Sequence, residues 1–177
     1  TVSGDSVSLA FTSAPDYDTA GDDDADNDYL VTVTISDGTN TGSTVSYTVT
    51  VDDTNDQTPS YTAGSTTISV DEGSTANIDS FAITDTDTTG TLACTESGND
   101  ADDFDCAISS GTLTITWTAT PDYDSATDSD TDNVYAYTIT VGDGTNSASS
   151  TTYAVTVDDT NDQTPSYSSS DTTPNID

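Results

Sequence analysis

The sequence lacks positive charge altogether: its 177 residues include no Lys, Arg or His, against 33 acidic residues that are almost all Asp. Without a basic group, nothing can neutralise a phosphate, which excludes nucleic acid and anionic membranes as partners. The absence of His removes the commonest general base and the nucleophilic sets built on it. The carboxylates recur with an internal repeat, and no single pair stands out in an apolar pocket, so we do not expect an enzyme.

Sulfur is scarce as well, with no Met and only Cys94 and Cys106. The two cysteines predict either one disulfide that closes a short loop or a pair of reduced core thiols, and we favour the disulfide. No apolar run approaches the roughly 20 residues of a membrane span, and residues 1–4 do not resemble a signal peptide. We expect a mature or internal segment of an exported protein, located extracellularly or at the cell surface.

High negative charge with modest hydrophobicity is also a signature of disordered chains. The apolar residues nevertheless alternate with polar ones in many short runs rich in Val, Ile, Tyr and Thr, for example at residues 7–11, 31–35 and 137–141. Such alternation is typical of half-buried strands and is absent from acidic tails. We therefore expect a folded all-β protein in which bound cations offset the repulsion among carboxylates.

An octapeptide, DDTNDQTP, occurs at residues 52–59 and again, unchanged, at residues 158–165, a spacing of 106 residues. The tetrapeptide PDYD at residues 15–18 returns at residues 121–124 with the same spacing. A period near 100 is typical of small β-sandwich modules and exceeds that of solenoid repeats. About seven strands separated by turn signals fill each period, which predicts tandem antiparallel Greek-key β-sandwich modules of the Ig-like type.

The period divides the chain into three predicted parts. Residues 1–58 are the C-terminal part of one module, with a strand over residues 7–11; residues 59–164 are a complete module; residues 165–177 are the first strand of the next. A tail donated by a neighbouring copy could build a head-to-tail polymer, but it would supply only the first missing strand of the N-terminal part. We therefore expect a window of a longer repeat array.

The repeated octapeptide holds several carboxylate, amide and carbonyl oxygens close together in a Pro-ended segment, where they repel one another unless a hard cation binds. Calcium accepts about six to eight oxygens in irregular geometry, whereas magnesium demands a tighter octahedron, and zinc and copper prefer nitrogen or sulfur. The alternative is that such loops are merely solvated. For the loops at residues 22–28 and 128–132 we favour that alternative, because their spacing fits no complete metal loop.

Five motifs in order resemble the cadherin repeat. They are Asp-Glu-Gly (71–73), Asp-Thr-Asp (85–87), Pro-Asp-Tyr-Asp (121–124), Asp-Gly (143–144) and Asp-Thr-Asn-Asp-Gln-Thr-Pro (159–165). The resemblance covers the module at residues 59–164 and the matching parts of its neighbours. It implies calcium ions between consecutive modules, bound by both modules and by the linker.

The resemblance implies two ligand sets. At the first junction they are Asp16 and Asp18 from upstream, Asp53, Asn55 and Asp56 from the linker, and Asp85, Asp87 and Asp143 from downstream. At the second junction they are Glu72, Asp122, Asp124, Asp159, Asn161 and Asp162. Asp stands at positions 18 and 124 where the family usually has Glu, which puts bidentate coordination there in question. Trp117 falls in a core-type alternation, so adhesion by exchange of an N-terminal Trp-bearing strand is not implied.

We therefore predict an extracellular, calcium-binding repeat array that forms a stalk, adhesin shaft or filament and has copies of itself as partners. The alternative is a module in which calcium bridges a carbohydrate or basic ligand, which would need an exposed aromatic platform. Ser and Thr crowd the outward strand faces, which would allow glycans as partners, but we favour the alternative that Thr is present as a strand former.

Overall fold

The computed structural model of the chain describes residues 2–3 and 6–168, and its regular elements are strands and two short 3-10 helices. In order they are β1 (Val2–Ser3), β2 (Ser6–Val7), β3 (Asp28–Ser36), β4 (Thr41–Thr50), β5 (Ser60–Tyr61), β6 (Thr67–Asp71), β7 (Asp79–Thr84), β8 (Ala93–Ser97), η1 (Ala101–Asp103), β9 (Phe104–Ser109), β10 (Thr112–Trp117), η2 (Tyr123–Ser125), β11 (Val134–Gly142) and β12 (Thr151–Asp158). No helix in this part of the chain is long and apolar enough to cross a membrane. The all-β prediction is confirmed.

Strands β5 to β12 form a sandwich of two four-stranded sheets, in the orders β5-β7-β10-β9 and β6-β12-β11-β8. The first strand of the sandwich is divided, with β5 in one sheet and β6 in the other, so eight segments appear where about seven strands were predicted. The neighbouring strands are antiparallel, as predicted, except that β6 runs parallel to β12, with Ile68 opposite Val155.

The core of the sandwich lies between the two sheets and is built by alternate residues of the strands. Leu113 and Ile115 on β10, and Ile139 on β11, are completely buried. Aromatic rings fill one part of this space: Tyr137 stacks between Phe104 and Tyr153, with ring centroids 3.8 Å and 5.2 Å away. Period-2 alternation therefore places the apolar face of each sheet inward, as expected for half-buried strands.

The predicted disulfide is present between Cys94 on β8 and Cys106 on β9, across a separation of 12 residues. β8 and β9 are edge strands of opposite sheets. The bond therefore ties the two layers together on one side of the sandwich.

Replacing both cysteines with serine is expected to lower the free energy of unfolding by about 3 kcal/mol, because the unfolded chain gains the freedom of the opened loop. Denaturant unfolding can be followed by the fluorescence of Trp117, the only tryptophan, which stacks on Phe104 of β9. A reducing agent should bring the unmodified chain to the same midpoint and leave the double variant unaffected. An unchanged midpoint for the variant without reductant contradicts the prediction.

The N-terminal part of the chain repeats the strand pairing of the sandwich at the 106-residue spacing. In β3–β4, Asp28 lies opposite Thr50, as Val134 lies opposite Thr156 in β11–β12. The short β1–β2 pair has the same register as β9–β10. The predicted strand over residues 7–11 is wrong beyond Val7, because β10 is flanked by β7 and β9, whereas β2 has β1 alone as its partner in the described residues.

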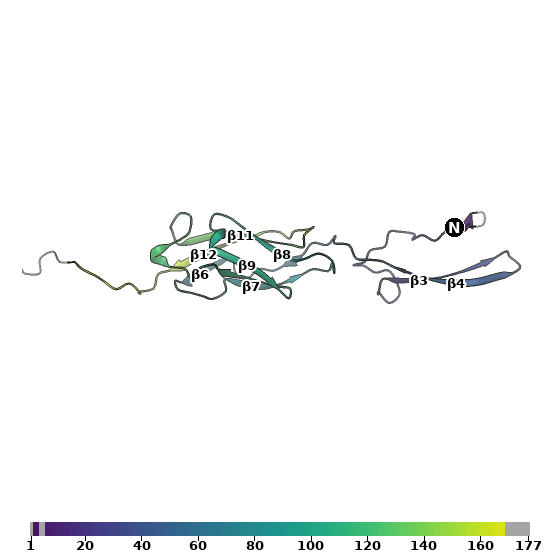
Figure 1. Cartoon of the computed structure of the whole chain (residues 1–177), viewed down its shortest axis with the longest axis horizontal. Coiled ribbons are helices and arrows are strands. Elements are labelled where there is room, and N and C mark those ends of the chain that lie inside the picture. The colour runs from purple at the N-terminus through teal and green to yellow at the C-terminus, as the bar shows by residue number, and fades with distance from the viewer. Residues whose placement is uncertain (1, 4–5, 169–177) are drawn as a thin grey trace, which may run out of the picture.

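The hairpin β3–β4 and the sandwich lie end to end along the long axis of the molecule, joined by the segment at residues 52–59 (Figure 1). The face of β3–β4 that matches the core face of β11–β12 is open: Tyr47 is 47% exposed, whereas its counterpart Tyr153 is fully buried. Ile35 is 58% exposed, and its counterpart Val141 is buried. At the other end, residues 165–168 form no strand, and the rest of the predicted strand at 165–177 lies outside the described residues.

Candidate metal centre

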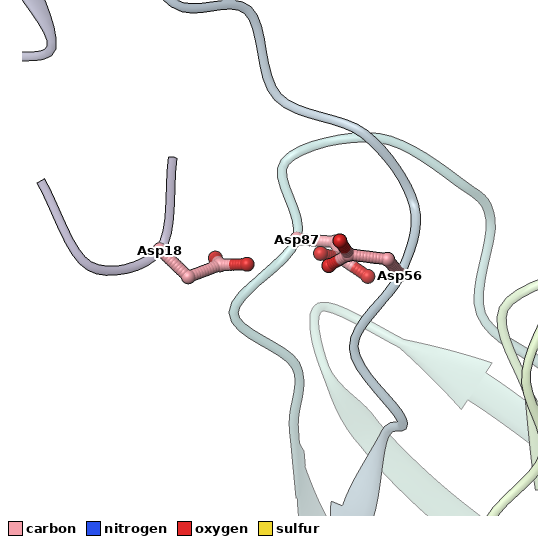
Figure 2. A group of neighbouring side chains, drawn as sticks. All are labelled: Asp18, Asp56 and Asp87. Atoms are coloured by element: carbon pink, nitrogen blue, oxygen red, sulfur yellow. The ribbon is translucent and has the colours of Figure 1, made fainter. Parts of the chain in front are cut away.

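Three carboxylates from three separate segments meet where the hairpin region joins the sandwich. They belong to Asp18 in the loop before β3, Asp56 in the linker and Asp87 in the loop after β7 (Figure 2). One oxygen from each lies within 4.8 Å of the others. Like charges this close repel even in water, and the chain has no basic side chain to separate them.

Asp87 also belongs to a second group, in which its carboxylate converges with those of Asp85 and Asp143. Asp143 is almost completely buried, and its Oδ1 accepts hydrogen bonds from the N–H groups of Thr145 and Asn146, both at 2.7 Å. These contacts fix the tight Asp-Gly turn after β11. Because Asp87 is shared, the two groups form one connected cluster of oxygens.

Buried oxygens without a partner show that this cluster fits a cation. Oδ1 of Asp53, Asp85 and Asp87 are each buried and accept no hydrogen bond. The second oxygen of Asp87 accepts from the N–H of Gln57 at 2.9 Å, and that of Asp53 accepts from Thr88. A buried carboxylate oxygen is costly unless it is paired, and a hard cation is the partner that such oxygens suit. Asp85, Asp87 and Asp143 could hold it together with Asp18, Asp53 and Asp56.

Burial, neighbouring charges and hydrogen bonds shift the pKa values of the cluster in different directions. Desolvation, and then the charge of Asp87, raise the pKa of Asp18; desolvation likewise raises the pKa of Asp85. Desolvation also acts to raise the pKa of Asp143, but the N–H groups of Asn146 and Thr145 outweigh it and lower that pKa. The charged form of Asp143 is therefore favoured, while the charged forms of Asp18 and Asp85 are disfavoured.

A second group lies at the opposite end of the sandwich and consists of Glu72, Asp124 and Asp159. Glu72 is held by the linker and by η2: its Oε1 accepts from the N–H of Thr160 at 2.7 Å and its Oε2 from the N–H of Tyr123 at 2.8 Å. Desolvation, and then the charge of Asp159, raise the pKa of Asp124. Asp124 is the counterpart of Asp18 at the 106-residue spacing, so this group corresponds to the upstream and linker part of the first junction.

Several predicted ligands lie beside these groups and not within them. Oδ1 of Asp16 accepts from the N–H of Asp18 at 3.1 Å, and Oδ1 of Asp122 from that of Asp124 at 3.0 Å, so both carboxylates shape the turn that presents the next one. Asp162 accepts from Gln163, and Asn161 lies at the bend between Thr160 and Asp162. Asn55 contacts the carbonyl oxygen of Asp143.

Two residues of the first junction were not foreseen. Gly90 has a φ of +91°, and a Cβ there would collide with the side chain of Asn55 and the carbonyl oxygen of Asp143. Asn146 donates from Nδ2 to the Oδ1 of Asn55 at 3.0 Å. The position of Gly90, in a loop next to a ligand motif, could have indicated a close backbone approach, because only Gly leaves room for one. Nothing in the sequence indicates the role of Asn146.

No family model and no curated protein matches the chain. Solved structures of cadherin ectodomains do. A protocadherin γB7 EC3-6 cis-dimer is 24% identical over 82% of the chain, with a TM-score of 0.60. The protocadherin γB4 extracellular domain is 22% identical over 83%, also with a TM-score of 0.60, and the human desmocollin-1 ectodomain is 17% identical over 80%, with a TM-score of 0.58.

The chain spans only 35%, 22% and 29% of these three structures, respectively. At these identities the likeness concerns the fold. It agrees with the order of acidic motifs in the sequence and with the two-sheet arrangement of β5 to β12. The chain therefore has a cadherin-like fold.

Proposed function

We propose that the chain is part of an extracellular, non-enzymatic array of cadherin-like modules whose junctions are made rigid by calcium. In this proposal residues 1–58 end one module, residues 59–164 form the next, and residues 165–177 begin a third. The partners are copies of the same module, joined in line as a stalk or filament.

The convergence of Asp18, Asp56 and Asp87 carries this proposal. The three residues belong to the upstream part, the linker and the sandwich, so one ion bound by them ties all three segments together (Figure 2). Extracellular calcium modules bind with dissociation constants of roughly 10⁻⁴–10⁻³ M. At about ten times the dissociation constant, each ion stabilises the bound arrangement by about 1.4 kcal/mol.

Three further observations support an external array. The disulfide between Cys94 and Cys106 is of a kind that persists in oxidising compartments. The strand pairs β3–β4 and β11–β12 share their register at the period of the sequence, as successive modules of one array would. The protocadherin γB4 and desmocollin-1 structures that share the fold are themselves described as an extracellular domain and an ectodomain.

Removing calcium with a chelator is expected to make the chain flexible at residues 52–59, because the carboxylates of the junction then repel one another. X-ray scattering should show a broader distribution of shapes, and limited proteolysis should cut within the linker. Asp87→Asn should weaken the response to calcium, since Asp87 belongs to both groups of the junction. Asp102→Asn removes the same charge at an exposed position and should behave like the unmodified chain. Identical scattering with and without chelator contradicts the proposal.

A further inference from the structure

A third kind of acidic cluster lies in the loop between η2 and β11, and it shares no residue with the junction groups. Asp128, Asp130 and Asp132 alternate along this loop, and one carboxylate oxygen from each lies within 4.8 Å of the others. The sequence alone favoured a solvated loop here. The environment of Asp128 argues otherwise.

Asp128 is only 3% exposed, and its Oδ1 is buried without a hydrogen-bond partner. Its other oxygen accepts from the N–H of Asp132 at 2.8 Å. A buried carboxylate with one unpaired oxygen is costly, and the chain has no Lys, Arg or His that could pair with it. The adjacent carboxylates of Asp130 and Asp132 are acceptors too, so no side chain of this loop cluster offers the oxygen a partner, and a cation would supply one.

The loop is held in place by backbone hydrogen bonds that engage one oxygen of Asp128 and one of Asp132, and by contacts to residues outside the three carboxylates. Asp100, itself 4% exposed, accepts from the N–H groups of Ser129 and Ala136, both at 2.7 Å. The N–H of Thr127 donates to the hydroxyl of Tyr135 at 3.1 Å. A ligand set fixed in this way loses little conformational entropy when an ion binds.

The same arrangement occurs a second time, 106 residues earlier. Asp22, Asp24 and Asp26 bring one oxygen each within 4.8 Å of the others. Oδ2 of Asp22 accepts from the N–H of Asp26 at 2.9 Å, and its Oδ1 is again buried without a partner. The N–H of Gly21 donates to the hydroxyl of Tyr29, as Thr127 does to Tyr135. The unpaired inner oxygen is therefore a property of this loop in both copies.

We propose that the loop at residues 128–132 binds one calcium ion inside the module, through Asp128, Asp130 and Asp132, and that the loop at residues 22–26 is a second such site. Calcium is the hard cation that fits, because three carboxylates on a short irregular loop can be completed by backbone oxygens and water without octahedral geometry. These ions hold the loop before β11 or β3 and are independent of the junction.

Counting bound calcium ions by native mass spectrometry of the full chain tests the proposal. Asp130→Asn should lose one ion under conditions that saturate the unmodified chain, with affinity at that site reduced by roughly tenfold or more. Asp24→Asn should lose one ion from the other loop, and the double variant should lose two. Asp130 is exposed and its carboxylate accepts no backbone hydrogen bond among the contacts described, so this variant should fold even if Asp128→Asn does not.

Two controls make the result decisive. Asp102→Asn carries the same change of charge and should keep every ion. Asp124 belongs to the junction group with Glu72, so Asp124→Asn should lose the junction ion and keep the loop ions. The proposals for the junction sites and for the loop sites are therefore tested separately. The proposal is overturned if Asp130→Asn binds the same number of ions, with the same affinities, as Asp102→Asn. In that event the loop at residues 128–132 holds no ion.

Discussion

Tyr153→Ala is expected to lower the free energy of unfolding of the sandwich by about 4 kcal/mol. The side chain is completely buried, stacks on Tyr137 and donates from its hydroxyl to Oδ2 of Asp79 at 2.8 Å. Its removal leaves a cavity between the sheets and takes away one of the two donors of Oδ2 of Asp79, which keeps only the N–H of Gly64. Since domains of this size are stable by only about 5–15 kcal/mol, the variant should be close to unfolding at ambient temperature.

Tyr47→Ala is the matched control, because Tyr47 occupies the same place in the repeat but is 47% exposed on β4. Its loss should cost less than about 1 kcal/mol. Urea unfolding followed by Trp117 fluorescence measures the stability of the sandwich for both variants, and circular dichroism measures that of the whole chain. Equal losses for Tyr47→Ala and Tyr153→Ala would refute the prediction and would show that the open face of β3–β4 is covered in solution.

Asp143→Ala is expected to lower the melting temperature by roughly 10 °C, because it leaves the N–H groups of Thr145 and Asn146 without the acceptor that fixes the turn after β11. Asp37→Ala removes the same turn contacts, to Thr39 and Asn40, at an exposed site and should cost much less. Asp143→Asn keeps an acceptor oxygen but loses the charge, so it should retain most of the stability while weakening calcium binding at the first junction.

The effect of Asp143→Ala should depend on pH. The pKa of Asp143 is lowered in the folded state, so its contribution to stability is present above the ordinary pKa of Asp and is lost as the pH falls through the lowered value. Thermal unfolding at a series of pH values, with calcium removed, should show the gap between variant and unmodified chain closing in acid. A gap that stays constant down to that range contradicts the prediction.

The fold was predictable from the sequence because its alternation is unusually regular. The alternating run at residues 137–141 lies on β11, and its apolar residues Tyr137, Ile139 and Val141 are all buried. The parallel pairing of β6 with β12 was not predictable, because alternation shows which face of a strand is buried but not the direction of its neighbour. The prediction of a strand over residues 7–11 was too long because alternation does not show how far a partner strand extends: β2 pairs with β1 only at Ser6 and Val7.

The candidate site was predictable only in part. The motif order pointed to Asp18, Asp56, Asp87 and Asp143, which the structure brings into two connected groups. The buried, unpaired Oδ1 atoms, which distinguish a metal site from a solvated loop, depend on packing that no spacing reveals. Asp100 illustrates the limit: it supports the loop at residues 128–132 from far upstream in the chain, and nothing in its local sequence indicates that role.

The parallel contact between β6 and β12 has a mechanical consequence. The chain enters the sandwich through β5, continues into β6 and leaves at the end of β12, so a tension along the long axis would act at opposite ends of the β6–β12 pair (Figure 1). Because the two strands point the same way, pulling slides one along the other, and the hydrogen bonds from Thr67 to Asp71 share the load at once and do not open one after another. The β6–β12 pair is therefore expected to resist tension in shear. The hydrogen bond from the N–H of Thr160 to Glu72 holds the chain just beyond the C-terminal end of the pair.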